Sequence, residues 1–185
     1  FSDAGKAVRF DENDVRPMGR TARGVRGMNL SDGQEVIAML VAPAEVAEGA
    51  VAAVEDAAAP NSVLTATENG YGKRTPIAEY TRHGRGTKGM IAIQTSERNG
   101  KVVAAALVSP EDQIMLITTG GVLVRTRVSE IREMGRATQG VTLINVDEGT
   151  HLSGLQRIAE SDSDEDGDDV GDEQSNSESD TAPDA

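Results

Sequence analysis

A short basic segment bounded by glycines recurs three times in this 185-residue sequence and is its strongest candidate for chemistry. The copies span 19–25, 84–90 and 135–141, and they share the pattern G-R-x-[AT]-[RKQ]-G-[VM]. Arginine donates paired hydrogen bonds to phosphate, and glycines let backbone N–H groups approach an anion closely. These residue types indicate a site for a phosphate-rich ligand rather than a catalytic site.

The repeat extends beyond the basic motif. An arginine stands ten residues before each motif, at Arg9, Arg74 and Arg125. A glycine stands four residues before each of these arginines, at Gly5, Gly70 and Gly121. An acidic residue followed by an apolar one also recurs, as Asp14-Val15, Glu79-Tyr80 and Glu130-Ile131. The copies are offset by 65 and 51 residues, so one unit has about 50 residues and must pack against its neighbours to bury its faces.

The basic motif of the first unit is expected to be an exposed loop. Four arginines between Arg16 and Arg26 have helical spacing, but Pro17 and the glycines of this segment disfavour a helix. Such loops on successive units would align phosphate contacts along one rim, which suits bent duplex DNA read through its backbone. The simpler alternative is that the glycines only shape the units and the arginines are solvated. The expected DNA contacts are Arg16, Arg20, Arg23, Arg26, Lys73, Arg74, Arg82, Arg85, Lys88, Arg132 and Arg136.

The apolar pattern within a unit predicts β-strands. Residues 114–118 form an apolar run that ends at Gly120-Gly121 and is followed by 122–124, as in a hairpin. The run 63–67 repeats this arrangement before an Asn69-Gly70 turn. Further β-rich stretches follow the motifs, at 90–93, 102–108, 141–146 and 152–158. Four short strands in about 50 residues are typical of a propeller blade.

We therefore expect an all-β chain of propeller- or pinwheel-like blades. The blades are predicted at 1–43, 63–110 and 113–159, with an Ala- and Glu-rich insertion at 44–62 between the first two. Phe1 aligns with Ala66 and Ile117, inside the opening strand of the other copies, so the chain is expected to begin within a blade.

The C-terminal segment 160–185 is predicted to be a disordered acidic tail. It holds 12 of the 31 acidic residues and no Lys or Arg, so it cannot bury enough apolar surface to offset the entropy of ordering. The other 19 acidic residues nearly balance the 18 basic ones, so the net charge of −13 does not argue against a nucleic-acid ligand for the body.

The sequence lacks the residues that several other classes of function require. The sequence has no cysteine, which excludes disulfides, thiolate nucleophiles and cysteine-ligated metals. His83 and His151 are isolated, the acidic residues show no metal-ligand spacing, and no G-x-x-x-x-G-K-[ST] loop is present for ATP. No apolar run approaches the roughly 20 residues of a membrane span.

Three segments carry a resemblance to a known family. The runs YTRHGRGTKGM (80–90), ITTGGVLVRT (117–126) and REMGRATQGV (132–141) resemble the C-terminal domain of the A subunit of bacterial DNA gyrase, and the similarity covers residues 1 to about 159. The resemblance implies a six-bladed β-pinwheel that exchanges strands between blades. It also implies a basic rim that wraps double-stranded DNA, so that strand passage introduces negative supercoils. This chain would then be the last half of the pinwheel.

The resemblance also implies what lies elsewhere. The tyrosine that cleaves DNA and the sites for ATP and Mg²⁺ belong to other parts of the enzyme, so we expect no catalytic residue, metal or cofactor in this segment. The partner that the family implies is the B subunit of gyrase, in an A2B2 heterotetramer. The family also implies a cytoplasmic, nucleoid-associated location without membrane contact.

Alternatives remain open at this point. The basic heptapeptide that marks the first blade of gyrase, the gyrase-A box, is absent, and 84–89 is at best related to it, so a topoisomerase IV C-terminal domain is the nearest alternative. The length of the acidic tail favours gyrase. A propeller scaffold that binds proteins is a further alternative. The tail is either a solubilising segment or an intramolecular competitor for the basic rim.

Overall fold

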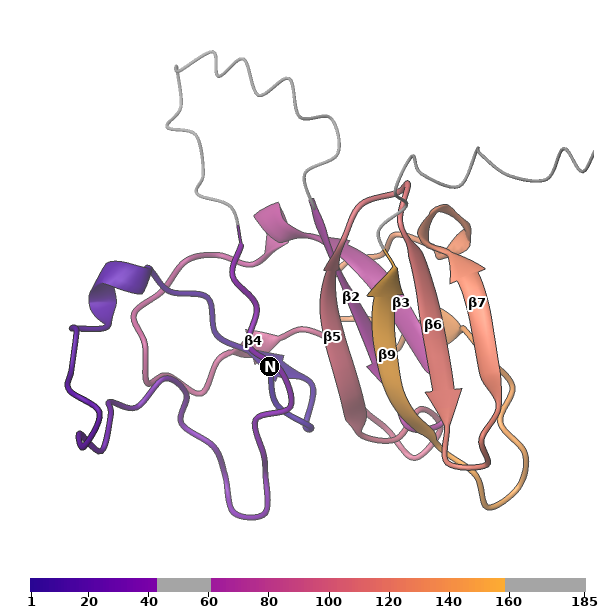
Figure 1. Ribbon diagram of the computed structural model, residues 1–185, viewed down its shortest axis with the longest axis horizontal. Coiled ribbons are helices and arrows are strands. Elements are labelled where there is room, and N and C mark those ends of the chain that lie inside the picture. The colour runs from indigo at the N-terminus through magenta and orange to yellow at the C-terminus, as the bar shows by residue number, and fades with distance from the viewer. Residues whose placement is uncertain (43–60, 159–185) are drawn as a thin grey trace, which may run out of the picture.

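The computed structural model describes residues 1–42 and 61–158 (Figure 1). The predicted tail and most of the predicted insertion lie outside these residues. The described strands are β1 (Lys6–Ala7), β2 (Ser62–Thr67), β3 (Tyr71–Pro76), β4 (Met90–Ile91), β5 (Val102–Val108), β6 (Gln113–Thr118), β7 (Leu123–Arg127), β8 (Val141–Thr142) and β9 (Leu152–Ile158). Short 3₁₀ helices, η1 (Glu12–Asp14), η2 (Ile77–Glu79) and η3 (Val128–Glu130), precede the basic motifs. The all-β class expected from the sequence is thus confirmed.

Both predicted hairpins form, and each turns on a glycine. β2 pairs with β3 and β6 pairs with β7, both antiparallel. Gly70 N–H donates to Thr67 O and Gly121 N–H donates to Thr118 O, both at 3.0 Å, and both glycines have a φ of 80°. Asn69 does not have a positive φ, so the turn differs from the two-residue Asn-Gly type and only its glycine takes the left-handed conformation.

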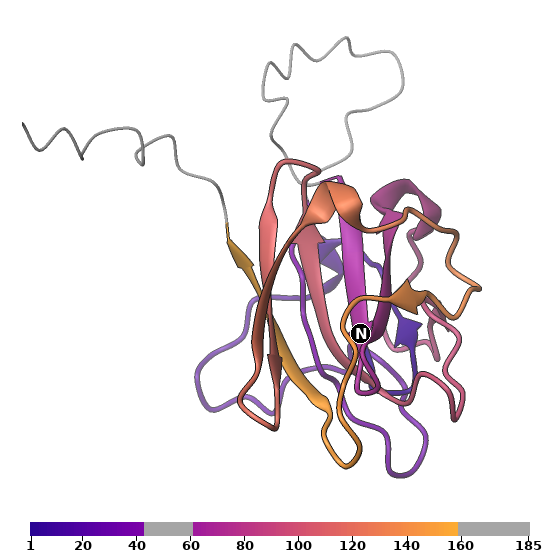
Figure 2. The ribbon, with the colours of Figure 1, turned by 90° about the vertical axis from the view of Figure 1, so that its right-hand side faces the viewer.

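Each unit passes the short strand after its basic motif to the unit before it. β4 of the second unit pairs with β1 of the first, with Met90 opposite Ala7. β8 of the third unit pairs with β3 of the second, with Val141 opposite Gly72, which gives a four-stranded sheet in the order β5-β2-β3-β8. Figure 2 shows β8 as the short orange arrow that leaves the rest of its unit. This is the strand exchange that the resemblance implied.

The last glycine of the motif makes this exchange possible. A side-chain carbon at Gly89 would lie 2.5 Å from Ala7 O, and one at Gly140 would lie 2.6 Å from Gly72 O. Both glycines also have positive φ, at 75° and 82°. At Gly24, which has the same position in the first unit, a side-chain carbon would meet no atom within 4 Å. The motif glycine is therefore required where two units meet.

The main core lies between two sheets that face each other (Figure 1). Leu64, Ala66 and Val108 from β2 and β5 pack with Ile114 and Leu116 from β6, and all five are fully buried. Burying each of the larger side chains stabilises the fold by roughly 2 kcal/mol. Because the two sheets belong to successive units, this core joins the second unit to the third.

The first unit is less regular than the others. Its residues 35–38 pair with Phe1, Ser2 and Asp3, through bonds such as Ile37 N–H to Phe1 O at 2.9 Å. Tyr80 of the second unit is buried and packs edge-on against the Phe1 ring, at 5.8 Å between centroids. Within residues 1–42, the first unit thus contributes strand β1 and a few bridging pairs rather than four strands.

Alanine substitutions separate two reasons for the motif glycine, which are its left-handed backbone conformation and the lack of room for a side-chain carbon. Gly140→Ala combines the left-handed conformation with the collision at Gly72 O, so we expect unfolding free energy to fall by about 2–4 kcal/mol. Gly24→Ala faces the conformational demand alone and should cost about 1 kcal/mol. Urea unfolding followed by circular dichroism measures both.

Gly154→Ala is the matched control for these variants. Gly154 lies in β9, and a side-chain carbon there would meet no atom within 4 Å, so the change should stay within about 0.5 kcal/mol. Equal losses for Gly140→Ala and Gly24→Ala would show that the contact with Gly72 does not hold the units together.

Candidate nucleic-acid interface

The three basic motifs lie on loops at equivalent positions of successive units, which we call the row of basic loops. We name them the first basic loop (16–29), the second basic loop (80–89) and the third basic loop (131–140). Gly86 N–H donates to Gly27 O at 2.7 Å and Asn29 N–H donates to Thr87 O at 2.8 Å, which ties the first loop to the second. Gln94 N–H donates to Thr138 O at 2.9 Å, which ties the third loop to the segment that follows β4.

The motif arginines of the second and third units hold the preceding unit. Arg85 donates from Nη1 to Arg26 O at 3.2 Å and from Nε to Asp14 O at 3.0 Å. Arg136 donates from Nη1 to Ile91 O at 3.0 Å. Arg26 and Ile91 hold the same position in the repeat, one residue after the motif, so the contact recurs at both junctions. The recurrence of the motif is therefore explained in part by packing between units.

The upstream arginine of the repeat makes the reciprocal contact. Arg74 donates from Nε to Ile131 O at 2.9 Å, and Arg9 donates from Nη1 to Tyr80 O at 3.1 Å. Ile131 and Tyr80 are again equivalent positions in successive units. Arg74, expected from the sequence to contact DNA, is half-buried and holds the start of the third basic loop.

Lys73 is placed differently from the other expected contacts. Its side chain is fully buried, and Nζ donates to the carbonyls of both Gly135 and Arg136. Burial lowers the pKa of Lys73 to about 8, and the nearby Glu79 carboxylate partly opposes this shift. The structure therefore places this ammonium group inside the protein, beneath the third basic loop.

A second group of basic side chains faces solvent. These residues are exposed and make no side-chain hydrogen bond or ion pair with the part of the chain that the structure describes. They are Arg16, Arg20, Arg23, Arg26, Lys88 and Arg132. Arg82 is also partly exposed, but it forms an ion pair of 3.1 Å with Asp11.

The arrangement fits contact with a row of phosphates. Exposed guanidinium and ammonium groups that make no internal bond can donate to phosphate oxygens without first breaking one. The first basic loop carries four of the six such groups, and the second and third carry one each. Among the described residues, the first basic loop therefore offers the most basic groups that are free to contact phosphate.

Sequence reasoning missed the residues that fix the loops. Thr75 donates from Oγ1 to Met134 O at 2.9 Å, and Arg136 N–H donates to Glu79 Oε2 at 3.1 Å. Asn99 is fully buried and donates to Gln139 O at 3.1 Å. The recurring acidic position that contains Glu79 was a visible signal, but spacing alone did not show its partner.

Residues 1–42 and 61–158 hold neither a cluster of metal ligands nor a helix that could span a membrane. No group of three or more His, Asp or Glu side chains there is placed to share a metal ion. In the same residues, no helix is long and apolar enough to cross a membrane.

Comparison with known proteins points to one family. A family model described as the DNA gyrase C-terminal domain, a β-propeller, matches residues 1–43, 61–109 and 112–159. The A subunit of DNA gyrase from Klebsiella oxytoca is 47% identical over 185 residues, which are 100% of this chain and 19% of that protein. Its counterpart from Neisseria gonorrhoeae is 50% identical over 153 residues, or 83% of this chain and 16% of that protein.

Solved structures show the same fold. The DNA gyrase A C-terminal domain superposes with a TM-score of 0.71 at 27% identity, covering 85% of this chain and 49% of that one. The C-terminal domain of DNA topoisomerase IV also gives a TM-score of 0.71, at 22% identity, over 85% of this chain and 45% of that one, a likeness of fold alone. The chain spans less than a fifth of the length of the curated relatives named above, at 19% and 16%. Since the family model matches most of its residues, this chain belongs to the DNA gyrase C-terminal domain family of β-propellers.

Proposed function

We propose that this chain binds the sugar–phosphate backbone of duplex DNA along its row of basic loops. The observation that carries the proposal is the set of six exposed basic side chains without internal partners among the described residues, on three loops at equivalent positions of successive units. A surface of this kind recognises phosphate spacing and DNA curvature rather than base sequence, because its contacts are to the backbone. Family membership supports the same ligand.

Within a longer polypeptide, the chain acts as the DNA-wrapping part of a DNA gyrase A subunit. The complete enzyme is a type II topoisomerase that introduces negative supercoils with ATP, and its A subunit joins the B subunit in an A2B2 heterotetramer. DNA cleavage and the use of ATP and Mg²⁺ are assigned to other parts of that enzyme. A cytoplasmic, nucleoid-associated location follows from this role.

Two other candidates receive less support. Topoisomerase IV shares the fold, but its solved domain is 22% identical to this chain against 27% for the gyrase A domain, and the family model that matches is that of gyrase. A propeller that binds proteins has no need of four exposed arginines on one loop. A protein-binding scaffold would show no preference for duplex DNA, whereas the proposed function requires one.

The acidic tail is proposed to compete with DNA for the basic loops. It carries 12 acidic residues and no basic ones, and it follows β9 directly in the chain. An attached polyanion acts at a high local concentration, so even weak contacts with the loops would lower DNA affinity.

Removing the arginines of the first basic loop tests the DNA proposal. The triple variant Arg16→Ala, Arg20→Ala and Arg23→Ala should bind duplex DNA roughly 10- to 100-fold more weakly in low salt. Each lost phosphate contact lowers the slope of log affinity against log salt by about 0.9, so the triple variant should lose up to about 2.7. Fluorescence anisotropy over a salt series measures both quantities.

Arg98→Ala is the control, because Arg98 lies outside the basic loops and stacks over the Tyr71 ring at 4.7 Å. It should leave the salt slope unchanged. Binding that is independent of salt, or a triple variant that binds as tightly as the natural chain, would contradict the proposal.

Deleting 160–185 tests the tail. We expect DNA affinity to rise several-fold at low salt and to converge with that of the full chain at high salt, where screening weakens the competition. A tail of equal length whose acids are changed to Asn and Gln should behave like the deletion. An affinity unchanged by both alterations would leave the tail a solubilising role only.

A further inference from the structure

Lys73 is a buried cation that surface contact with DNA cannot use. Its side chain is fully buried, and its ammonium group donates to two consecutive carbonyls, those of Gly135 and Arg136. A buried ammonium costs several kcal/mol unless its donors are satisfied, so these bonds are needed for the side chain to remain there. They belong to the first two residues of the motif in the third unit.

Glu79 binds the same stretch of backbone, but as a hydrogen-bond acceptor. Arg136 N–H donates to Glu79 Oε2 at 3.1 Å, while Lys73 Nζ donates to the carbonyl of Arg136. Thr75 Oγ1 donates to Met134 O, one residue before the motif. Three side chains of the second unit thus satisfy consecutive backbone groups of the third basic loop. Backbone groups held by charged partners lose much of their freedom to move.

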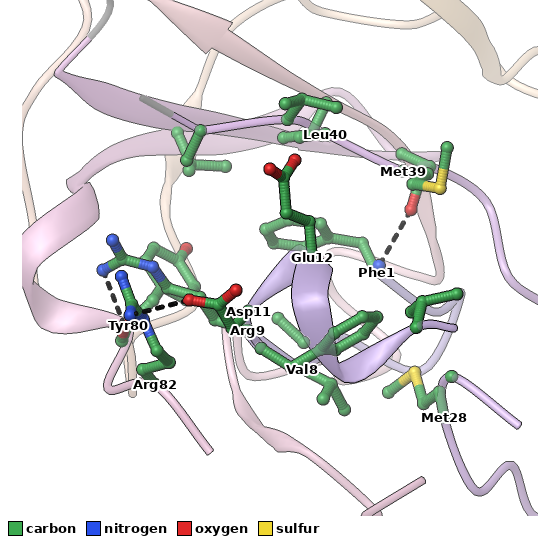
Figure 3. Close-up of a pocket in the computed structure, with 18 of the residues that line it drawn as sticks. Phe1, Val8, Arg9, Asp11, Glu12, Met28, Met39, Leu40, Tyr80 and Arg82 are labelled. Atoms are coloured by element: carbon green, nitrogen blue, oxygen red, sulfur yellow. Dashed lines mark hydrogen bonds and ion pairs between the residues drawn. The ribbon is translucent and has the colours of Figure 1, made fainter. Parts of the chain in front are cut away.

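The junction between the first and second units lacks the pair of charged side chains that holds the third basic loop. Val8 stands at the position of Lys73, and it lines a cavity of about 880 Å³ with Phe1, Met28, Leu40 and Tyr80 (Figure 3). Asp14 stands at the position of Glu79, and it offers its backbone carbonyl to the Arg85 guanidinium. Arg9 and Asp11 of the first unit still contact the second basic loop, at Tyr80 and Arg82, but the side chains of Val8 and Asp14 do not bond the backbone of its motif as Lys73 and Glu79 do in the third.

We propose that Lys73 and Glu79 are positioning residues that preorganise the third basic loop for DNA. They act through the backbone at Gly135 and Arg136 and leave the phosphate contact to the exposed Arg132. The DNA half of this inference rests on the proposed function, whereas the holding of the loop does not depend on DNA.

Because Glu79 is negatively charged, the direction in which its removal changes DNA affinity tests the proposal. Glu79→Ala removes a negative charge beside a basic loop, which by field alone would tighten DNA binding. Because the loop loses its anchor, we expect binding several-fold weaker instead. The matched control is Glu133→Ala, which removes an exposed acid of the same loop that has no side-chain bond within the described residues and should tighten binding slightly.

Lys73→Met tests the buried cation by the salt slope. A positioning residue predicts several-fold weaker binding with an unchanged slope, whereas a phosphate contact predicts a slope smaller by about 0.9. Val108→Ala, which destabilises a fully buried position of β5 away from the loop, controls for general loss of stability and should leave affinity unchanged.

Amide hydrogen exchange in the DNA-free 185-residue chain tests the holding of the loop by itself. In Lys73→Met and Glu79→Ala, exchange at residues 134–137 should accelerate at least about tenfold relative to exchange in β6. Unchanged exchange there, tighter DNA binding by Glu79→Ala, or a reduced slope for Lys73→Met would each overturn the inference. Accelerated exchange in a chain that does not bind DNA at all would remove the proposed function and retain the loop-holding role.

Discussion

The structure depends on the backbone contact that a strand from one unit makes with the unit before it. At Gly140 against Gly72 and at Gly89 against Ala7, a carbonyl lies so close that no side-chain carbon fits. This proximity allows β8 to join the sheet of the second unit and β4 to join β1. Once the strands are exchanged, each basic loop is carried across the junction and rests on its neighbour.

The same constraint divides the basic residues into two kinds. Arg85 and Arg136 end on carbonyls of the preceding unit, and Arg74 ends on a carbonyl of the following one, so these arginines fix where the loops lie. Arg20, which has the motif position in the first unit, is exposed without such a partner among the described residues. One repeat position thus serves packing at the junctions and is open to a ligand at the first unit. Charge alone does not distinguish these roles, because both need a guanidinium group.

Much of the fold could be predicted from the sequence, because the repeat signals are local. The hairpin glycines Gly70 and Gly121, the apolar runs and the unit length of about 50 residues all follow from spacing and turn chemistry. Which basic residues hold the loops and which remain open to a ligand could not be predicted. Lys73 follows Tyr71 and Gly72 in an ordinary strand pattern, and nothing local shows that its ammonium group ends on the backbone 62 residues later. Such contacts are set by the exchange of strands, which the propensities of single segments do not encode.

A titration of the arginine side chains by NMR distinguishes most directly the arginines that bind DNA from those that hold the loops. In a ¹⁵N-labelled chain, each Nε–H group reports whether its guanidinium meets a short DNA duplex. We predict that the resonances of Arg16, Arg20 and Arg23 shift on binding, while that of Arg74 stays in place because its Nε is already bonded to Ile131 O. A shift confined to Arg74, with the three arginines of the first basic loop unmoved, would contradict this prediction.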